Sequence, residues 1–346
     1  MSQPAAWAVA DLPWPSQSIE AMDNLCHTLV GAAMGRAGLR RTTRFAGVTL
    51  MIAANLPDLD VLVFATSTPS VEFRRGWTHG VIAQLVLPLA LTAVLLLIDR
   101  WRPSTVSRHS RAGEVQVPPF RPGWVLLLSY LGVYSHVLLD LMNTYGVRLL
   151  APVDWRWFYG DALFILDPWL WLTLGLGVWL SRRRASSAPA RVALIIAAIY
   201  IGGMVVSARA ARAGVLDAWR AETGAQAVAA MVGPEPVTPF ARQVIIDAGD
   251  HYETGTFNWL ASPHVAWQHD RVAKNQGRAD VLTAQRTPAF RSYLVWSRFP
   301  FYKIETEAGG TRVSVGDMRF SLVGAVGRAI GRDRFSVTTL VPRSAD

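Results

Sequence analysis

Residues 135–146 read SHVLLDLMNTYG and end an apolar segment that begins near Gly123. His136 and Asp140 are four residues apart, so on a helix their side chains lie on one face, one turn apart. An imidazole and a carboxylate inside an apolar helix are costly unless each has a partner. A divalent metal would be a partner for both, whereas a plain His–Asp hydrogen bond would only fix two helices. The stretch therefore predicts either a metal site or a structural pair.

The composition indicates a membrane protein. Hydrophobic residues make up 51% of the 346 residues and charged residues only 17%, and the mean hydropathy is +0.24; soluble domains carry more charge. The net charge is +9. Because the arginines fall between apolar segments, this charge fits the positive-inside rule better than a nucleic-acid partner. The single cysteine, Cys26, excludes an intrachain disulfide.

Four apolar segments are long enough to cross a bilayer as helices. They are residues 80–98, 123–142, 162–180 and 192–208. Two shorter apolar segments, Asn24–Arg36 and Phe45–Ala54, precede them and predict a helical hairpin. Each is only about 20 Å long as a helix, so we expect neither to cross by itself. Gly31 and Gly35 have the GxxxG spacing that lets helices pack closely.

The pattern changes after Arg209. Residues 209–230 predict a helix rich in Ala and Arg, and residues 233–239 predict a linker rich in Pro. Beyond them, the runs RQVIID, SYLVWSRF, YKIET and TRVSV predict strands, and Gly309–Gly310 predicts a hairpin turn. We expect a small β-rich domain at this end of the chain.

These patterns divide the chain into four parts. Residues 1–21 are an N-terminal extension without the pattern of a cleavable signal peptide, and Met22 is an alternative start. Residues 22–208 form a polytopic helical membrane domain that carries the candidate site. Residues 209–239 form a helix and linker, and residues 240–346 form the β-rich domain. The predicted fold class is mainly α, with a β-rich C-terminal domain.

Alternating the direction of successive helices places three basic turns on one side of the membrane, residues 36–44, 99–122 and 181–191. The positive-inside rule makes that side cytoplasmic. The opposite side receives seven candidate site residues. They are His27, Asp58, Asp60, His79, His136, Asp140 and Asp161. We therefore expect the site and the C-terminal domain to lie on the extracytoplasmic side of the membrane.

Imidazole and carboxylate together are the usual ligands of Zn²⁺, and they also bind Mn²⁺ or Fe²⁺. A set of three His and three Asp suits a two-metal hydrolytic centre. Each residue also has a structural interpretation. Asp58 and Asp60 are typical turn formers beside Pro57, and Thr78 could cap the helix that follows His79. Asp167 before Pro168 is better explained as a helix N-cap than as a ligand.

Five motifs then resemble a known family. They are CHTLVGAAMG, NLPDLD, RGWTHG, SHVLLDLMNTYG and GDALFILDP, within residues 22–208. In order and spacing they resemble the YdjM-type family of membrane-bound metal-dependent hydrolases, also described as LexA-regulated inner-membrane hydrolases. That family is in turn similar to zinc-dependent phospholipase C.

The resemblance implies a helical metal site like that of phospholipase C, with His27, Asp58, His79, His136 and Asp140 as ligands. The phospholipase pattern continues with an H-x-x-x-E pair, which has no counterpart after Asp140. Asp60 or Asp161 could substitute for it as a ligand.

The function that we expect is metal-dependent hydrolysis of a phosphoester or a lipid-like ester, with the bilayer as partner. The cofactor would be a divalent metal, with zinc first and Mn or Fe as alternatives. Asp60 or Asp161 would act as general base. Two alternatives stay open, namely a non-catalytic metal-binding or transport protein and a membrane anchor for the C-terminal domain. A transporter would need polar groups along a whole path, which the segments 80–98 and 192–208 do not offer.

Overall fold

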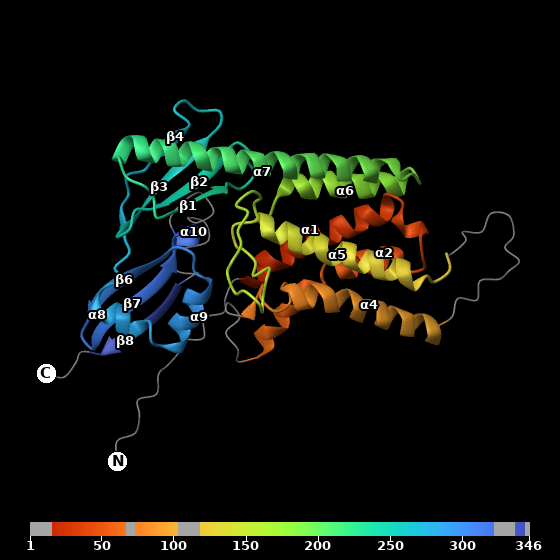
Figure 1. Cartoon of the computed structure of the whole chain (residues 1–346), viewed down its shortest axis with the longest axis horizontal. Helices are drawn as coiled ribbons and strands as arrows, with labels where there is room; N and C mark the ends of the chain where they lie inside the picture. Colours follow the sequence, from red (N-terminus) through yellow and green to blue (C-terminus); the bar gives the residue numbers. More distant parts are fainter. Residues whose placement is uncertain (1–15, 67–72, 103–117, 322–335, 343–346) are drawn as a thin grey trace, which may run out of the picture.

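The computed structural model describes residues 16–66, 73–102, 118–321 and 336–342. Its helices lie side by side along the long axis of the molecule, and its two sheets lie together at one end (Figure 1). The N-terminal extension predicted at residues 1–21 lies mostly outside the described residues, and the first helix begins at Ser16. The predicted mainly α architecture with a C-terminal β part is thus confirmed in outline.

The helical part contains six α-helices and two 3-10 helices among the described residues. The α-helices are α1 (Ser16–Arg36), α2 (Ala46–Ala53), α4 (Val81–Trp101), α5 (Pro122–Met142), α6 (Pro168–Arg183) and α7 (Ala188–Thr223). The 3-10 helices are η1 (Leu39–Arg41) and η2 (Leu56–Ala65). The predicted hairpin of α1 and α2 is present, and η2 continues it beyond Asn55.

Three of these helices, α4, α5 and α7, are long and apolar enough to cross a membrane. Helix α2 and the first part of η2 pass the same test together, but they are bent by 45° at the break between them. They form either a broken span or a re-entrant loop, as expected from the Pro at the start of η2. The expected span at residues 162–180 is wrong at its start, because the helix begins only at Pro168. Asp167 caps it, accepting hydrogen bonds from the backbone N–H groups of Trp169 and Leu170, which confirms the N-cap prediction.

Close helix contacts bring the site segments together. Gly31 of α1 faces the backbone of α2, where a Cβ on this residue would lie 2.7 Å from the carbonyl oxygen of Leu50. No larger side chain fits at that distance, so the predicted close contact at Gly31 is confirmed. Helix α2 also packs on α5, and α5 packs on α4. As a result, the ends of α2, α4 and α5 meet at one level.

Helix α7 runs without a break through the predicted domain boundary at residue 209. The residues around Arg209 are mostly Ala, Val and Arg, which favour a continuous helix. Its far half is part of a core with the first sheet, through Ala211, Val215 and Trp219. Gly224, with a φ of 69°, ends it in the left-handed conformation that favours glycine. The predicted separate helix from residue 209 is therefore the second half of α7.

The first sheet is antiparallel and lies against α7 (Figure 1). Its strands are β1 (Ala229–Pro234), β2 (Ala241–Asp247), β3 (His251–Asn258), β4 (Val265–Trp267) and β5 (Val272–Ala273), in the order β1-β2-β3-β4 with β5 beside β3. The linker predicted at residues 233–239 therefore starts inside β1. The sheet begins earlier than expected because Ala230 and Val232 pack against α7.

The second sheet has the order β6-β7-β8, from β6 (Pro300–Glu307), β7 (Gly310–Asp317) and β8 (Ser336–Pro342). The predicted hairpin turn at Gly309–Gly310 is confirmed. Short helices α8 (Ala279–Ala284), α9 (Pro288–Trp296) and α10 (Met318–Ser321) accompany it. The strand predicted at SYLVWSRF is wrong, since most of it belongs to α9. Phe290, Tyr293 and Trp296 recur every three residues, which puts one face of a helix on this sheet.

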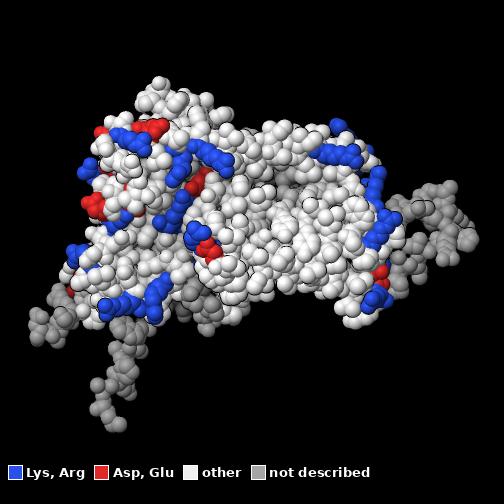
Figure 2. All heavy atoms as spheres, viewed as in Figure 1, with Lys and Arg blue, Asp and Glu red and all other residues white. Residues whose placement is uncertain are grey.

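Charged residues gather at the two ends of the molecule (Figure 2). Between them, the visible face of the helical part is almost free of Lys, Arg, Asp and Glu. The basic turns meet at the end away from the sheets: Arg44 pairs with Asp99 at 2.6 Å, and Arg191 donates to the carbonyl of Ala37. An uncharged band between charged ends is typical of a membrane-embedded helical domain.

Candidate metal centre

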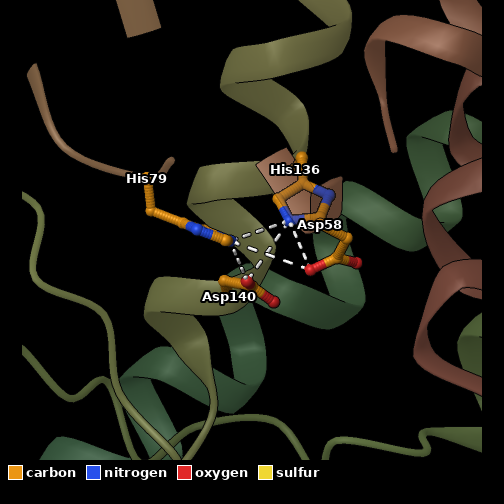
Figure 3. Close-up of side chains that lie close together, drawn as sticks. All are labelled: Asp58, His79, His136 and Asp140. Atoms are coloured by element: carbon orange, nitrogen blue, oxygen red, sulfur yellow. Dashed lines mark hydrogen bonds and ion pairs between the residues drawn. The ribbon is translucent and has the colours of Figure 1, made fainter. Parts of the chain in front are cut away.

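Four of the five predicted ligands meet at one point of the helical part (Figure 3). Asp58 comes from η2, His79 from the turn before α4, and His136 and Asp140 from α5. One ligand atom of each residue lies within 4.8 Å of the corresponding atoms of the other three. His79, His136 and Asp140 are buried, and Asp58 is 8% exposed. The four side chains thus form a compact, nearly closed group.

Four distances within the group are close to the edges of a small coordination polyhedron, and Nε2 of His79 lies farther from Oδ1 of Asp58, at 3.9 Å. Nε2 of His79 lies 3.1 Å from Nε2 of His136 and 3.1 Å from Oδ2 of Asp140. Nε2 of His136 lies 3.3 Å from Oδ2 of Asp140 and 3.6 Å from Oδ1 of Asp58. A tetrahedral site with bonds of about 2.0–2.2 Å has edges of about 3.3–3.6 Å. The donor atoms therefore have nearly the right separation for one divalent ion.

The orientation of His136 leaves its Nε2 without a proton. Its Nδ1 lies 2.8 Å from the carbonyl oxygen of Ala54. Because a carbonyl can only accept, Nδ1 must carry the proton, and in the neutral ring Nε2 then presents a lone pair to the cluster.

His79 is held in the same tautomer by two other groups. Its Nδ1 lies 3.0 Å from Oγ1 of Thr78, and that hydroxyl donates to Oδ2 of Asp60 at 3.1 Å. The hydroxyl proton is used on the carboxylate, so the Thr78 oxygen accepts from Nδ1–H of His79. Such a partner on the far nitrogen is the usual support of a metal-bound histidine.

Two imidazole lone pairs therefore face each other 3.1 Å apart, with two carboxylate oxygens beside them. Buried acceptors that point at one another repel unless a positive charge lies between them. A divalent ion supplies that charge and matches the ligand types, so the residues fit a metal. A proton shared between the two rings is the structural alternative.

The fifth predicted ligand, His27, lies beside the cluster. Its ring stacks on that of His136 with centroids 3.8 Å apart, and its Nε2 is 3.6 Å from Oδ1 of Asp140. Helix α1 holds it there through the close contact of Gly31 with α2. The structure thus brings His27 next to Oδ1 of Asp140, whereas His79 and His136 approach Oδ2 of the same carboxylate. The role of His27 as a ligand stays a prediction.

The two predicted general bases occupy different places. Asp60 is buried and accepts hydrogen bonds from Thr78 and from the Arg75 backbone, and it approaches the cluster through His79. Asp161 forms a two-pronged ion pair with Arg298, at 2.8 and 3.0 Å. Within the described residues, no hydrogen bond or ion pair joins Asp161 to the four clustered side chains. The geometry of Asp60 suits a residue that orients His79.

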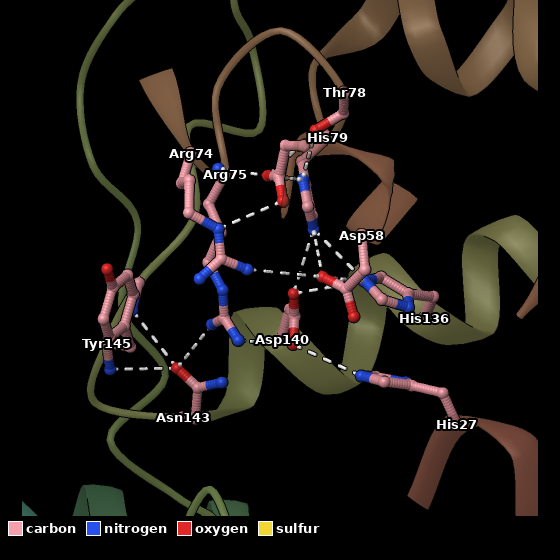
Figure 4. Close-up of polar contacts among 12 residues, drawn as sticks. His27, Asp58, Arg74, Arg75, Thr78, His79, His136, Asp140, Asn143 and Tyr145 are labelled. Atoms are coloured by element: carbon pink, nitrogen blue, oxygen red, sulfur yellow. Dashed lines mark hydrogen bonds and ion pairs between the residues drawn. The ribbon is translucent and has the colours of Figure 1, made fainter. Parts of the chain in front are cut away.

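The sequence reasoning missed two buried arginines, Arg74 and Arg75 (Figure 4). Nε of Arg74 lies 3.1 Å from Oδ1 of Asp60, and Nη2 of Arg75 lies 3.1 Å from Oδ1 of Asp140. Burial lowers the pKa of Arg74 to about 10, so it remains charged at neutral pH. A signal was available, because this pair stands in FRRGWTHG on the side that the positive-inside rule leaves poor in arginine.

Thr78 also differs from its predicted role. Helix α4 begins after Gly80, and no side chain caps it. Thr78 instead connects Asp60 to His79. A threonine that was expected to support the helix thus supports a candidate ligand.

Comparison with known proteins agrees with the resemblance noted in the sequence. One curated relative is an uncharacterized protein, YfhP, of Bacillus subtilis (strain 168), which is 21% identical over 204 residues. The match covers 55% of this chain and 56% of the relative, so the chain spans about half the length of that protein. No solved structure matches. The family of the YdjM inner membrane protein matches residues 22–211, which include all four clustered side chains. The chain therefore belongs to the YdjM inner membrane protein family.

Proposed function

We propose that this protein is a membrane-bound, metal-dependent hydrolase that acts on an ester bond. One observation carries the proposal: two imidazole Nε2 atoms and two carboxylate oxygens converge in a buried site, with both rings fixed in the metal-binding tautomer. Such mixed His and carboxylate sites are typical of hydrolytic zinc centres. Zinc is the first expectation, and Mn or Fe are alternatives.

When bound, the ion would supply a Lewis acid that activates water and polarises the ester. The remaining work belongs to the chain. His136 is held by the Ala54 carbonyl and His79 by Thr78 and Asp60, so that both lone pairs stay aimed at one point. Asp58, the most exposed of the four, lies where a substrate would approach. Water is largely excluded, which strengthens every electrostatic contact in the site.

A non-catalytic metal site is the second candidate, and the burial of the cluster favours it. His79, His136 and Asp140 are at most 1% exposed, as in a structural site that only stabilises the fold. The two functions make the same prediction for metal content and opposite predictions for turnover.

The test is to measure metal per chain in the purified protein and in the variants His79→Ala, His136→Ala and Asp140→Ala, together with hydrolysis of a panel of phosphoesters and carboxylic esters. We expect about one ion per chain in the wild type and almost none in the variants, with hydrolysis reduced at least about 100-fold. His269→Asn is the control, because this exposed histidine has a φ of 53°, which Asn tolerates.

A wild-type protein that stays metal-free after dialysis against Zn²⁺ or Mn²⁺ would rule out both candidates. Full loading without turnover on any ester would leave the structural metal site.

We further propose that the metal centre and both sheets face the extracytoplasmic side of the membrane. The basic turns meet at the opposite end of the helices, which the positive-inside rule makes cytoplasmic. Reporters fused after Ser110, Leu150 and Gly224 should read inside, outside and outside. A cytoplasmic signal after Gly224, with the other two reporters as expected, would overturn the span count.

A further inference from the structure

Arg74 and Arg75 are two consecutive buried guanidinium groups at the edge of the metal centre. Buried charges are expensive, and a pair of them beside a ligand set needs a reason. The geometry points to a subsite for one phosphodiester anion, formed by Arg74 and Arg75 beside the metal ligands. This inference rests on the proposed function and names the substrate class for that same site.

The charge of the site favours a singly charged ligand. With neutral imidazoles, Asp58, Asp60 and Asp140 contribute three negative charges, and Arg74 and Arg75 contribute two positive ones. A divalent ion turns the resulting charge of minus one into plus one. A phosphodiester carries the compensating charge, whereas a carboxylic ester is neutral and leaves the buried excess uncompensated.

Arg75 is held rigidly, as a phosphate-binding fork requires. Its Nη1 donates to Oδ1 of Asn143 at 3.2 Å, its Nη2 lies 3.1 Å from Oδ1 of Asp140, and its guanidinium lies over the ring of Tyr145 at 4.8 Å. Three supports on one planar group fix its orientation before any ligand arrives. A guanidinium held in this way is a fixed positive charge beside the ligand set, and arginines in such positions bind phosphoryl oxygens through charge-assisted hydrogen bonds.

The backbone at this position is also unusual. Arg75 has a φ of 51°, which non-glycine residues seldom adopt. Its N–H donates to Oδ2 of Asp60 at 2.9 Å, and its carbonyl accepts from the Arg148 N–H at 2.9 Å. Because Arg75 has a left-handed backbone, Arg74 contacts Asp60 while Arg75 contacts Asp140. Two adjacent arginines therefore both reach the candidate metal centre from the same turn of the chain.

The surroundings allow a ligand with apolar chains. Leu59 lies between Asp58 and Asp60 and points outward, as do Leu62 and Trp77. In η2, the Asp side chains therefore face the interior, and Leu59 and Leu62 face outward, as expected of a segment next to lipid. A phosphodiester could come from a lipid headgroup or from a soluble compound, and the experiment below separates the two sources.

The experiment uses the full-length, metal-loaded protein in detergent micelles and measures the affinity for diethyl phosphate by phosphorus NMR. Removing one charged donor should weaken binding about 10- to 100-fold in Arg74→Gln and Arg75→Gln. Arg75→Lys, which keeps the charge without the fork, should fall between these variants and the wild type. Arg291→Gln, at an exposed position of α9, is the matched control and should bind like the wild type. Chelation of the metal should abolish binding in every variant.

Metal content separates this inference from the proposed function. Variants that keep full metal and lose diethyl phosphate support the subsite. Full metal with unchanged affinity in both Gln variants overturns the subsite and leaves a metal-dependent hydrolase of another ester. A second arm compares diethyl phosphate with dihexanoyl phosphatidylglycerol. Tighter binding of the lipid identifies a membrane source, and equal binding identifies a soluble one; a failure to bind either compound overturns the inference.

Discussion

Two of the buried ionic groups among the described residues, the candidate metal centre and the Asp317–Arg319 pair beside the second sheet, are built in opposite ways. The Asp317 carboxylate accepts from Nε and the backbone N–H of Arg319, and from Ser297 and the Arg298 and Phe299 backbones. Donors therefore surround every face of this acceptor. In the metal centre, acceptors face acceptors: the Nε2 atoms of His79 and His136 lie 3.1 Å apart.

This difference separates a closed structural pair from a ligand set. The Asp317–Arg319 pair is complete within the chain, so its removal should cost stability and nothing else. The candidate metal centre lacks a donor between its two imidazole rings, so under the proposed function the loss of one of its ligands should cost metal and turnover. Burial alone does not distinguish the two groups, because both are almost fully buried. The two groups differ in the direction in which their hydrogen-bond donors and acceptors point.

The largest effect on stability is expected from Asp317→Asn. The amide cannot balance the charge of Arg319, and breaking a buried pair costs about 3–5 kcal/mol. Thermal unfolding in detergent, followed by near-UV circular dichroism, should show a markedly lower midpoint with unchanged metal content. Asp217→Asn is the control, since this side chain is 78% exposed and its loss should cost less than about 0.5 kcal/mol.

The same variant has a pH signature. Burial alone would raise the pKa of Asp317, but the charge and hydrogen bonds of Arg319 outweigh it and hold the pKa below its usual value. A depressed folded-state pKa contributes stability above the unfolded value of about 3.9, and this stability is lost as the pH falls further. The wild type should therefore lose stability steeply below about pH 4, and Asp317→Asn should lack this part of the loss. Equal acid profiles would contradict the assignment.

A smaller effect on stability is expected from Asp161→Asn, which removes a third ion pair, the one with Arg298. Asp161 is largely buried and accepts two hydrogen bonds from Arg298, so its loss should cost about 1–3 kcal/mol. Its φ of 49° is tolerated by Asn. Metal content and hydrolysis should stay within about twofold of the wild type. A fall of about 100-fold in turnover with full metal would instead restore Asp161 as the general base.

Periodicity predicted the parts of the fold that depend on local pattern. Helix α5 was expected from Gly123 to Met142 and begins one residue earlier. The pattern was less informative where tertiary contacts decide. Residues 292–296 are rich in strand formers, yet they complete a helix whose aromatic face packs on the second sheet. The boundary predicted at residue 209 falls inside α7 for a similar reason, because the buried residues of α7 change partners from α1 and α6 to the first sheet without any break in the helix.

For the candidate site, the residue types and the convergence of four ligands could be expected from spacing and helix direction. The support of the ligands could not. Thr78 was interpreted as a helix cap, because capping is a local property, whereas its hydrogen bond to Asp60 depends on a segment far away in the chain. The arginines were overlooked because a basic residue in a polar connection is usually solvated, and only the fold shows that these two are buried.

The length of α7 has a consequence for the position of the sheets. A helix of 36 residues is about 54 Å long, whereas the hydrocarbon core of a bilayer is about 30 Å thick. The first sheet is packed on the second half of α7, so its distance from the apolar first half and its rotation about the helix axis depend on the number of residues in α7. One inserted residue would raise the sheet by about 1.5 Å and turn it by about 100°. The position and the rotation of the first sheet relative to the apolar half of α7 can therefore change only together, in steps of whole residues.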